Sequence, residues 1–214
     1  MNRTETPFIP SFVEKQFTDN QGREVVHLRG REVAADVGNS EVKFIFGPNP
    51  QETIVIPNVV TEMEFKGLLA REQDVLEALR VKIESSALKR EWATMAVGEL
   101  ASRLEYNKEM LFGSIKAEED QIVIVLLTGL AVDAVRNFPV KDKVCYATYS
   151  MSTGLPISEY RNEELRIKFK KKLTEGTHTV RFLETAYPYN GVEVRIQIFD
   201  VRVEAISKFG LHTK

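Results

Sequence analysis

Five residues between positions 36 and 43 combine the side chains that could bind an anion together with a divalent cation. The carboxylate of Asp36 could hold a divalent cation or an activated water. Gly38 lets the backbone turn and lets another group approach the main chain closely. Asn39 and Ser40 tolerate turn geometry and bring hydrogen-bonding side chains. Consecutive turn amides can form an anion-binding concavity, and Lys43 adds a positive charge, so this spacing favours a site for an anionic ligand.

A β-hairpin is the element that would bring these five residues together. The short apolar run 33–35 predicts a strand that delivers Asp36 at its end. A turn centred on Gly38 follows, and the alternating apolar residues of 42–46 predict a second strand. Residues 53–56 predict a third strand, so the three strands would form an antiparallel meander. The alternative interpretation is an ordinary hairpin with an Asn-Ser turn, in which the Asp36 carboxylate has no binding role.

The sequence Asp-x-Gly-Asn-Ser-x-x-Lys at 36–43, followed by Ile-Pro-Asn-Val-Val at 56–60, resembles a known phosphate-binding hairpin. It is similar to the first such hairpin of the actin-like ATPases, specifically in the bacterial plasmid-segregation ParM/StbA and Alp branch. Three later segments resemble the end of the first domain in that branch: residues 154–161, 169–173 and 191–198. Together these segments extend the resemblance over most of the chain from Arg31 to Glu204.

The resemblance implies an α/β fold of the actin-like, ribonuclease H-like type, with a mixed sheet, packed helices and a small inserted subdomain. It divides the chain into four parts: an N-terminal extension at 1–30, an actin-like N-terminal domain at 31–205, its inserted subdomain at about 60–112, and a tail at 206–214. The phosphate hairpin of the family lies very near the N-terminus. The first 30 residues therefore depart from the family, either as an added strand or arm or as a partly ordered leader.

The function implied by the resemblance is that of an N-terminal nucleotide-binding domain. The complete protein would form filaments for plasmid partitioning in the cytoplasm, using ATP and Mg²⁺. In that role, Asp36 would be catalytic and would hold Mg²⁺ through water. Gly38, Asn39 and Ser40 would bind the β- and γ-phosphates, and Lys43 would neutralise phosphate charge.

The resemblance also implies partners. These are further copies of the protein in a filament and a DNA-binding adaptor protein, with no direct nucleic-acid contact and no membrane. A basic run at 166–172 is a candidate contact for the filament or the adaptor. A solvated helix face is the alternative interpretation of that run.

Two other classes of function remain open beside the nucleotide-binding domain. One is a non-catalytic assembly module with an actin-like fold, which should survive the loss of Asp36. The other is a small-molecule kinase of the same superfamily, which needs an acceptor pocket with a catalytic aspartate. The family's second phosphate hairpin, usually of Asp-x-Gly-Gly-Thr type, and its glycine-rich adenosine contact do not occur in this sequence. We therefore expect half of an active site, in a fragment of a longer protein or in a stand-alone domain completed by a partner chain.

Length and composition limit the possible folds and functions further. The 214 residues, of which 43% are hydrophobic, can bury a substantial core in one large or two small domains. A formal net charge of -2 gives no general electrostatic reason to expect nucleic-acid binding. Cys145 is the only cysteine, which excludes a disulfide within the chain and fits a reducing compartment. No stretch reaches the roughly 18 to 20 apolar residues of a membrane span, and the N-terminus lacks a signal-peptide pattern.

The second half of the chain supplies the elements that would support the hairpin. Residues 120–137 are apolar nearly all round, which predicts a helix buried between layers. Residues 144–153 predict a central strand that ends at Gly154, so a layered α/β core is expected. A charged helix is predicted at 159–173. The strands expected after it carry His178, which we expect at the surface or in a cross-strand pair rather than as a ligand.

Overall fold

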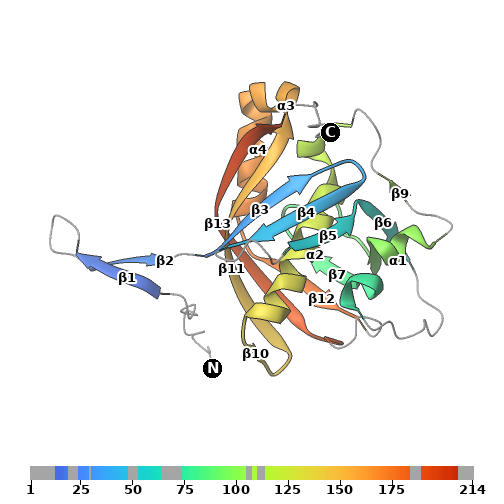
Figure 1. Cartoon of the computed structure of the whole chain (residues 1–214), viewed down its shortest axis with the longest axis horizontal. Helices are drawn as coiled ribbons and strands as arrows, with labels where there is room; N and C mark the ends of the chain where they lie inside the picture. Colours follow the sequence, from blue (N-terminus) through green and yellow to red (C-terminus); the bar gives the residue numbers. More distant parts are fainter. Residues whose placement is uncertain are drawn as a thin grey trace, which may run out of the picture.

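The computed structural model describes residues 13–18, 24–28, 30–47, 53–63, 74–104, 108–109, 114–183 and 189–206 (Figure 1). Its strands are β1 (Val13–Thr18), β2 (Glu24–Leu28), β3 (Arg31–Val37), β4 (Glu41–Phe46), β5 (Thr53–Pro57), β6 (Val59–Glu62), β7 (Arg80–Glu84), β8 (Met95–Val97), β9 (Lys108–Glu109), β10 (Val140–Lys141), β11 (Val144–Pro156), β12 (His178–Phe182) and β13 (Glu193–Ile206). Its helices are η1 (Val75–Ala78), α1 (Glu99–Ser102), η2 (Lys116–Glu118), α2 (Asp120–Asn137), α3 (Ile157–Arg161) and α4 (Glu163–Thr174).

The core of the molecule is a mixed sheet of eleven strands. The strand order is β5-β4-β3-β11-β13-β12-β7-β8-β6-β9, and β10 pairs with β11. Strand β11 is parallel to both β3 and β13, and β3, β4 and β5 form an antiparallel meander. In Figure 1 the long strands β11 and β13 run side by side, with α4 beside them. The predicted mixed sheet and the predicted meander are confirmed.

The segment expected as an inserted subdomain contributes strands to this same sheet. Its strand β7 pairs with β12, and β8, β6 and β9 follow in order. The described strands of the first 30 residues, β1 and β2, pair with each other in a separate two-stranded sheet. The division of the chain into an extension, a domain and an insertion stays a prediction. The described helices include none that is long and apolar enough to cross a membrane.

Helix α2 is the buried centre of the fold, as its sequence predicts. Every residue from Asp120 to Val135 is buried, and the helix packs on strands that include β4, β5, β11 and β13. Gly129 lies against the ring of Phe44, which is fully buried and stacks on Phe46. A Cβ atom at Gly129 would come within 2.3 Å of the Phe44 ring. The absence of a side chain at this position therefore allows the helix to approach the sheet.

Replacing Gly129 by alanine is expected to destabilise the fold, although alanine is the better helix former. The added methyl would overpack a fully buried aromatic ring, at a cost of about 1 to 3 kcal/mol. The gain in helix propensity offsets only about 1 kcal/mol of this cost. Urea denaturation of the wild type and of Gly129→Ala measures the net change in the free energy of unfolding. Equal or greater stability of the variant would show that Phe44 moves away at little cost.

Three elements differ in extent from the sequence-based prediction. The single charged helix predicted at 159–173 is wrong: α3 and α4 are separated at Asn162, whose side chain accepts a hydrogen bond from the Leu165 amide at 3.2 Å and begins a new helix. Strand β11 does not end at Gly154 but continues to Pro156. Strand β13 runs beside it to Ile206. A paired parallel neighbour overrides the local signals of glycine and proline.

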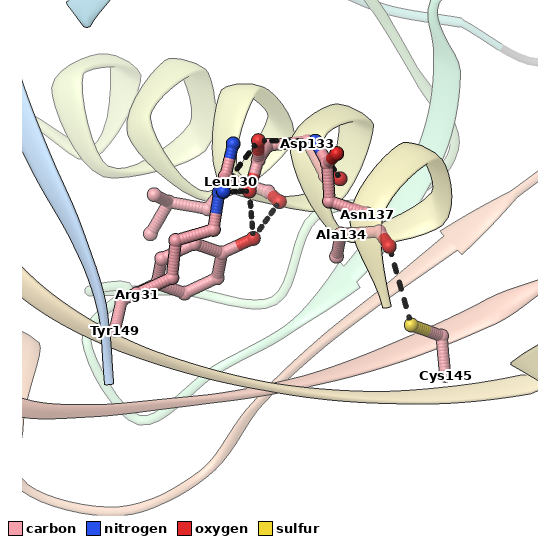
Figure 2. A network of polar contacts seen from close by, with 7 residues as sticks. All are labelled: Arg31, Leu130, Asp133, Ala134, Asn137, Cys145 and Tyr149. Atoms are coloured by element: carbon pink, nitrogen blue, oxygen red, sulfur yellow. Dashed lines mark hydrogen bonds and ion pairs between the residues drawn. The ribbon is translucent and has the colours of Figure 1, made fainter. Parts of the chain in front are cut away.

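A buried polar network fixes the start of β3 to α2 and β11 (Figure 2). Asp133 of α2 accepts hydrogen bonds from Arg31 Nε at 3.0 and 3.2 Å, from the Tyr149 hydroxyl at 2.8 Å and from the Asn137 amide at 2.8 Å. Burial raises the pKa of Asp133, against the opposing effects of Tyr149 and Arg31. Cys145 lies at the edge of this network, where burial raises the pKa of its thiol to about 11. The network fixes the strand that carries Asp36.

His178 is in a cross-strand pair, which is one of the two positions expected for it, and it does not lie at the surface. It is fully buried on β12, opposite Ile196, and it links three segments. Its Nε2 lies 2.9 Å from the Leu173 carbonyl oxygen, and its Nδ1 lies 2.7 Å from the Ser85 hydroxyl. A neutral imidazole satisfies both contacts when Nε2–H donates to Leu173 and the Ser85 hydroxyl donates to Nδ1.

Burial lowers the pKa of His178, so this residue should make stability depend on pH. Its contribution is fully present above the unfolded value near 6.5 and is lost as pH falls from there toward the lower folded pKa. The free energy of unfolding of the wild type should therefore decline more steeply below pH 6.5 than that of His178→Gln. Urea titrations of both proteins at a series of pH values measure the difference. Parallel curves would contradict a neutral buried histidine.

Candidate functional site

The β3–β4 hairpin brings the predicted site residues together. Asp36 and Lys43 lie directly opposite each other on the two strands, and both side chains are exposed on the same face. Within the described part of the chain, no ion pair joins these two residues, and both charged side chains are exposed to solvent. The turn Gly38–Ser40 connects their strands. The structure thus places all five residues in one unit.

The hairpin turn lies at the carboxyl edge of the parallel strands. Strand β11 runs in register with β3 up to the pair Thr153 and Ala35, and with β13 up to the pair Pro156 and Ile206. The carboxyl ends of β3, β11 and β13 therefore point to the same edge of the sheet. In open α/β sheets, ligands bind at this edge.

Gly38 is required by close packing within the turn. A Cβ atom at this position would lie 2.6 Å from the carbonyl oxygen of Glu41, which is closer than real Cβ contacts allow. The turn is therefore tight because a side chain is absent there.

Two residues that were not predicted as site residues, Asn58 and Lys116, hydrogen-bond to backbone carbonyls at the turn. Asn58 donates from Nδ2 to the Gly38 carbonyl at 2.9 Å and from its backbone amide to the Ser40 carbonyl at 2.8 Å. Lys116 donates from Nζ to the Val37 carbonyl. Asn58 belongs to the segment that carries the resemblance to the actin-like hairpin, which was the one available signal. No local pattern indicates that Lys116 would approach this turn.

A second layer of buried side chains supports these two residues. Gln121, at the start of α2, donates from Nε2 to the Asn58 carbonyl at 2.6 Å. The carboxylate of Glu159 accepts hydrogen bonds from the backbone amides of Lys116 at 3.1 Å and Ala117 at 3.0 Å. Gln121 and Glu159 are both buried. The turn is therefore connected to the buried helix rather than held by the hairpin alone.

The chemistry of the hairpin fits a phosphate group with a hydrated Mg²⁺ ion. The described residues contain no group of three or more histidine, cysteine or acidic side chains that could hold a metal by themselves. Mg²⁺ usually keeps several waters and binds proteins through one or two carboxylates together with substrate phosphates. The exposed carboxylate of Asp36, beside turn amides and the cation of Lys43, is such a donor set.

Comparison with known proteins identifies the family. The family model described as "Actin like proteins N terminal domain" matches residues 34–205. The chain therefore belongs to the actin-like proteins, and the matched region is their N-terminal domain. No match was found among curated proteins.

Several solved structures share the fold. ParM of Bacillus thuringiensis with ATP is 28% identical, with a TM-score of 0.63, over 83% of this chain and 46% of that one. The ParM filament of Clostridium botulinum is 18% identical, with a TM-score of 0.63, over 84% of this chain and 48% of that one. The actin-like protein Alp7A is 22% identical, with a TM-score of 0.58, over 81% of this chain and 44% of that one. The chain spans somewhat less than half the length of these relatives.

These comparisons confirm the predicted resemblance to the ParM and Alp branch and the predicted actin-like fold. They concern the domain as a whole and not the single residues of the hairpin. The assignment of Asp36, Gly38, Asn39, Ser40 and Lys43 to a site continues as a proposal.

Proposed function

We propose that this chain is the N-terminal nucleotide-binding domain of a ParM-type, filament-forming protein for plasmid partitioning. The observation that carries the proposal is the register of the β3–β4 hairpin, which sets Asp36 opposite Lys43 beside a tight turn. The position of this turn at the carboxyl edge of the parallel strands supports it. It is also supported by the solved structures of a similar ParM with ATP, with ADP and with AMPPNP.

In this proposal each residue of the hairpin has a separate role. Gly38, Asn39 and Ser40 bind the β- and γ-phosphates, chiefly through the turn amides. Lys43 lies on the exposed face of β4 and neutralises phosphate charge. Asp36 holds Mg²⁺ through water, and a bound Mg²⁺ would supply positive charge to the phosphate oxygens. The chain's own contribution is to bind and orient the phosphates.

The activity of the complete protein is part of the same proposal. A second domain would close over the nucleotide and supply the rest of the site. Copies of the protein would then assemble into filaments in the cytoplasm, and a DNA-binding adaptor would link them to a plasmid. The exposed lysines of α4 are a candidate surface for one of these contacts. Three lysines of this helix pair with described carboxylates of the chain. Lys168 pairs with Glu118 at 2.9 Å, Lys170 with Asp200 at 2.7 Å and Lys172 with Asp120 at 3.8 Å.

The charge of Lys43 provides the first test of the phosphate site. Lys43→Ala should weaken ATP binding by about fivefold, since an exposed ion pair contributes about 1 kcal/mol at most. The loss should be similar with and without Mg²⁺, because the lysine contacts the phosphates directly. Lys82→Ala is the matched control, since Lys82 is exposed on β7 of the same sheet and pairs with Glu84. Isothermal titration calorimetry measures all three proteins.

These titrations test the role of Lys43 and the nucleotide-binding function of the domain separately. Equal affinities of wild type, Lys43→Ala and Lys82→Ala for ATP would remove Lys43 from the site. Failure of the wild-type chain to bind ATP at all would remove the nucleotide-binding function from this domain by itself. An intact fold in Lys43→Ala, checked by circular dichroism, makes either result interpretable.

A further inference from the structure

One buried residue binds two peptide groups of the candidate phosphate turn. Asn58 lies between β5 and β6 and is 1% exposed. Its Nδ2 donates to the carbonyl oxygen of Gly38 at 2.9 Å, and its backbone amide donates to the carbonyl oxygen of Ser40 at 2.8 Å. A single residue outside the hairpin thus fixes the direction of two carbonyl groups within the turn.

The direction of a carbonyl also fixes the direction of the next amide. In a planar trans peptide the C=O group and the following N–H point in opposite directions. Because the Gly38 carbonyl points toward Asn58, the N–H of Asn39 points away from it. Because the Ser40 carbonyl also points toward Asn58, the N–H of Glu41 points away as well. Two donors of the turn are therefore directed to the side opposite Asn58, where amides of this kind can bind an anion.

Asn58 is itself held in one orientation. Gln121 donates from Nε2 to the carbonyl oxygen of Asn58 at 2.6 Å and to its Oδ1 at 3.3 Å. An amide oxygen that faces Gln121 leaves the Nδ2 group to face Gly38, which sets the side-chain rotation. Gln121 is 3% exposed and belongs to α2, the buried helix at the centre of the fold. The orientation of the turn is therefore coupled to the core.

The same contacts reduce the negative potential of the turn. Carbonyl oxygens carry partial negative charge and would repel a phosphate. Asn58 binds two of them, and Lys116 Nζ binds a third at Val37. A solvent-exposed hairpin turn can hydrogen-bond to water, so its stability alone does not require a buried amide, whose desolvation is costly.

We propose that Asn58, held by Gln121, is a positioning residue that directs the Asn39 and Glu41 amides toward a bound polyphosphate. This inference rests on the proposed function, because it concerns the same hairpin. It assigns to Asn58 no contact with the nucleotide itself.

The wild-type chain provides the first measurement. Titration with tripolyphosphate, followed in ¹H–¹⁵N correlation spectra, should shift the amide protons of Asn39 and Glu41 downfield, and more than other amides of the domain. Shifts confined to other residues of the hairpin would overturn the positioning role and leave the phosphate site in place. Absence of any binding at the hairpin would overturn the proposed function together with this inference.

A variant then tests the role of the side chain. Asn58→Ala removes the bond to Gly38 but keeps the backbone bond to Ser40, so tripolyphosphate affinity should fall about tenfold. Asn137→Ala is the control, because it also removes a side-chain amide hydrogen bond, here to Asp133 within α2, at the end of that helix far from Gln121. Its affinity should remain that of the wild type.

Two readouts separate positioning from stability. In Asn58→Ala the amide signal of Asn39 should lose its response to tripolyphosphate, while signals of the rest of the sheet stay unchanged. Unchanged affinity in a folded Asn58→Ala protein would overturn the positioning role alone. If this variant fails to fold, the shifts of Asn39 and Glu41 in the wild type still decide the matter.

Discussion

Replacing Asp36 by alanine is expected to abolish most of the magnesium dependence of ATP binding. Asp36 is exposed at the end of β3, where it would hold a hydrated Mg²⁺ through charge-assisted hydrogen bonds. Such bonds contribute about 1.5 to 3 kcal/mol, which corresponds to about 10- to 150-fold in affinity. Without Mg²⁺ the carboxylate would instead repel the phosphates, so the variant should then bind ATP at least as well as the wild type.

Calorimetric titrations of ATP with Mg²⁺ and with a chelator measure this dependence. Glu32→Ala is the matched control, since Glu32 is an exposed acidic residue on the same face of β3, four residues before Asp36. It should behave as the wild type under both conditions. An equal loss of affinity in Asp36→Ala with and without Mg²⁺ would show that Asp36 does not act through a metal. Such a result would favour a structural role of the carboxylate in the turn.

Replacing Asp133 by alanine is expected to cause a large loss of stability. The substitution removes the acceptor of four hydrogen bonds and leaves Arg31, whose side chain is 18% exposed, without this buried carboxylate (Figure 2). Breaking a buried ion pair typically costs about 3 to 5 kcal/mol. Since Arg31 keeps partial access to water, we expect about 2 to 4 kcal/mol for this variant.

Urea denaturation measures this loss. Asp200→Ala is a useful control, because its ion pair with Lys170 is largely exposed and should contribute about 1 kcal/mol or less. Tyr149→Phe, which removes one hydrogen bond to Asp133, should lie between these two variants. A loss below about 1 kcal/mol for Asp133→Ala would contradict the view that this network fixes β3 to α2.

Elements with a clear pattern of apolar residues could be predicted from the sequence. The alternation in 42–46 predicts β4, and the continuous apolar surface of 120–137 predicts the buried helix α2, whose bounds in the structure are the same. The break between α3 and α4 was missed because Asn162 acts as an N-cap, a local effect that the charge pattern hides. The full burial of His178 depends on α4 and on Ser85, which no local pattern reveals.

The candidate site likewise contains residues that could be predicted from the sequence and residues that could not. Asp36 and Lys43 could be paired from the sequence, because the length of a hairpin turn fixes the register of its strands. Asn58 lies 20 residues from Gly38, and Lys116 lies 79 residues from Val37. The structure brings them together through the end of β5 and through η2. A residue after Pro57 has the features of a turn, so its buried role at the hairpin could not be deduced from local chemistry.

The most direct test of the central claim replaces Mg²⁺ by paramagnetic Mn²⁺ in a complex of the chain with ATP. A metal held at Asp36 should broaden the amide signals of residues 36–43 at substoichiometric Mn²⁺, and only when ATP is present. Signals of Arg181 on β12 should remain sharp, as should those of the basic residues of α4. The Asp36→Ala variant should lose this selective broadening. Broadening centred elsewhere on the domain, or equally strong without ATP, would contradict a magnesium-nucleotide site at the β3–β4 hairpin.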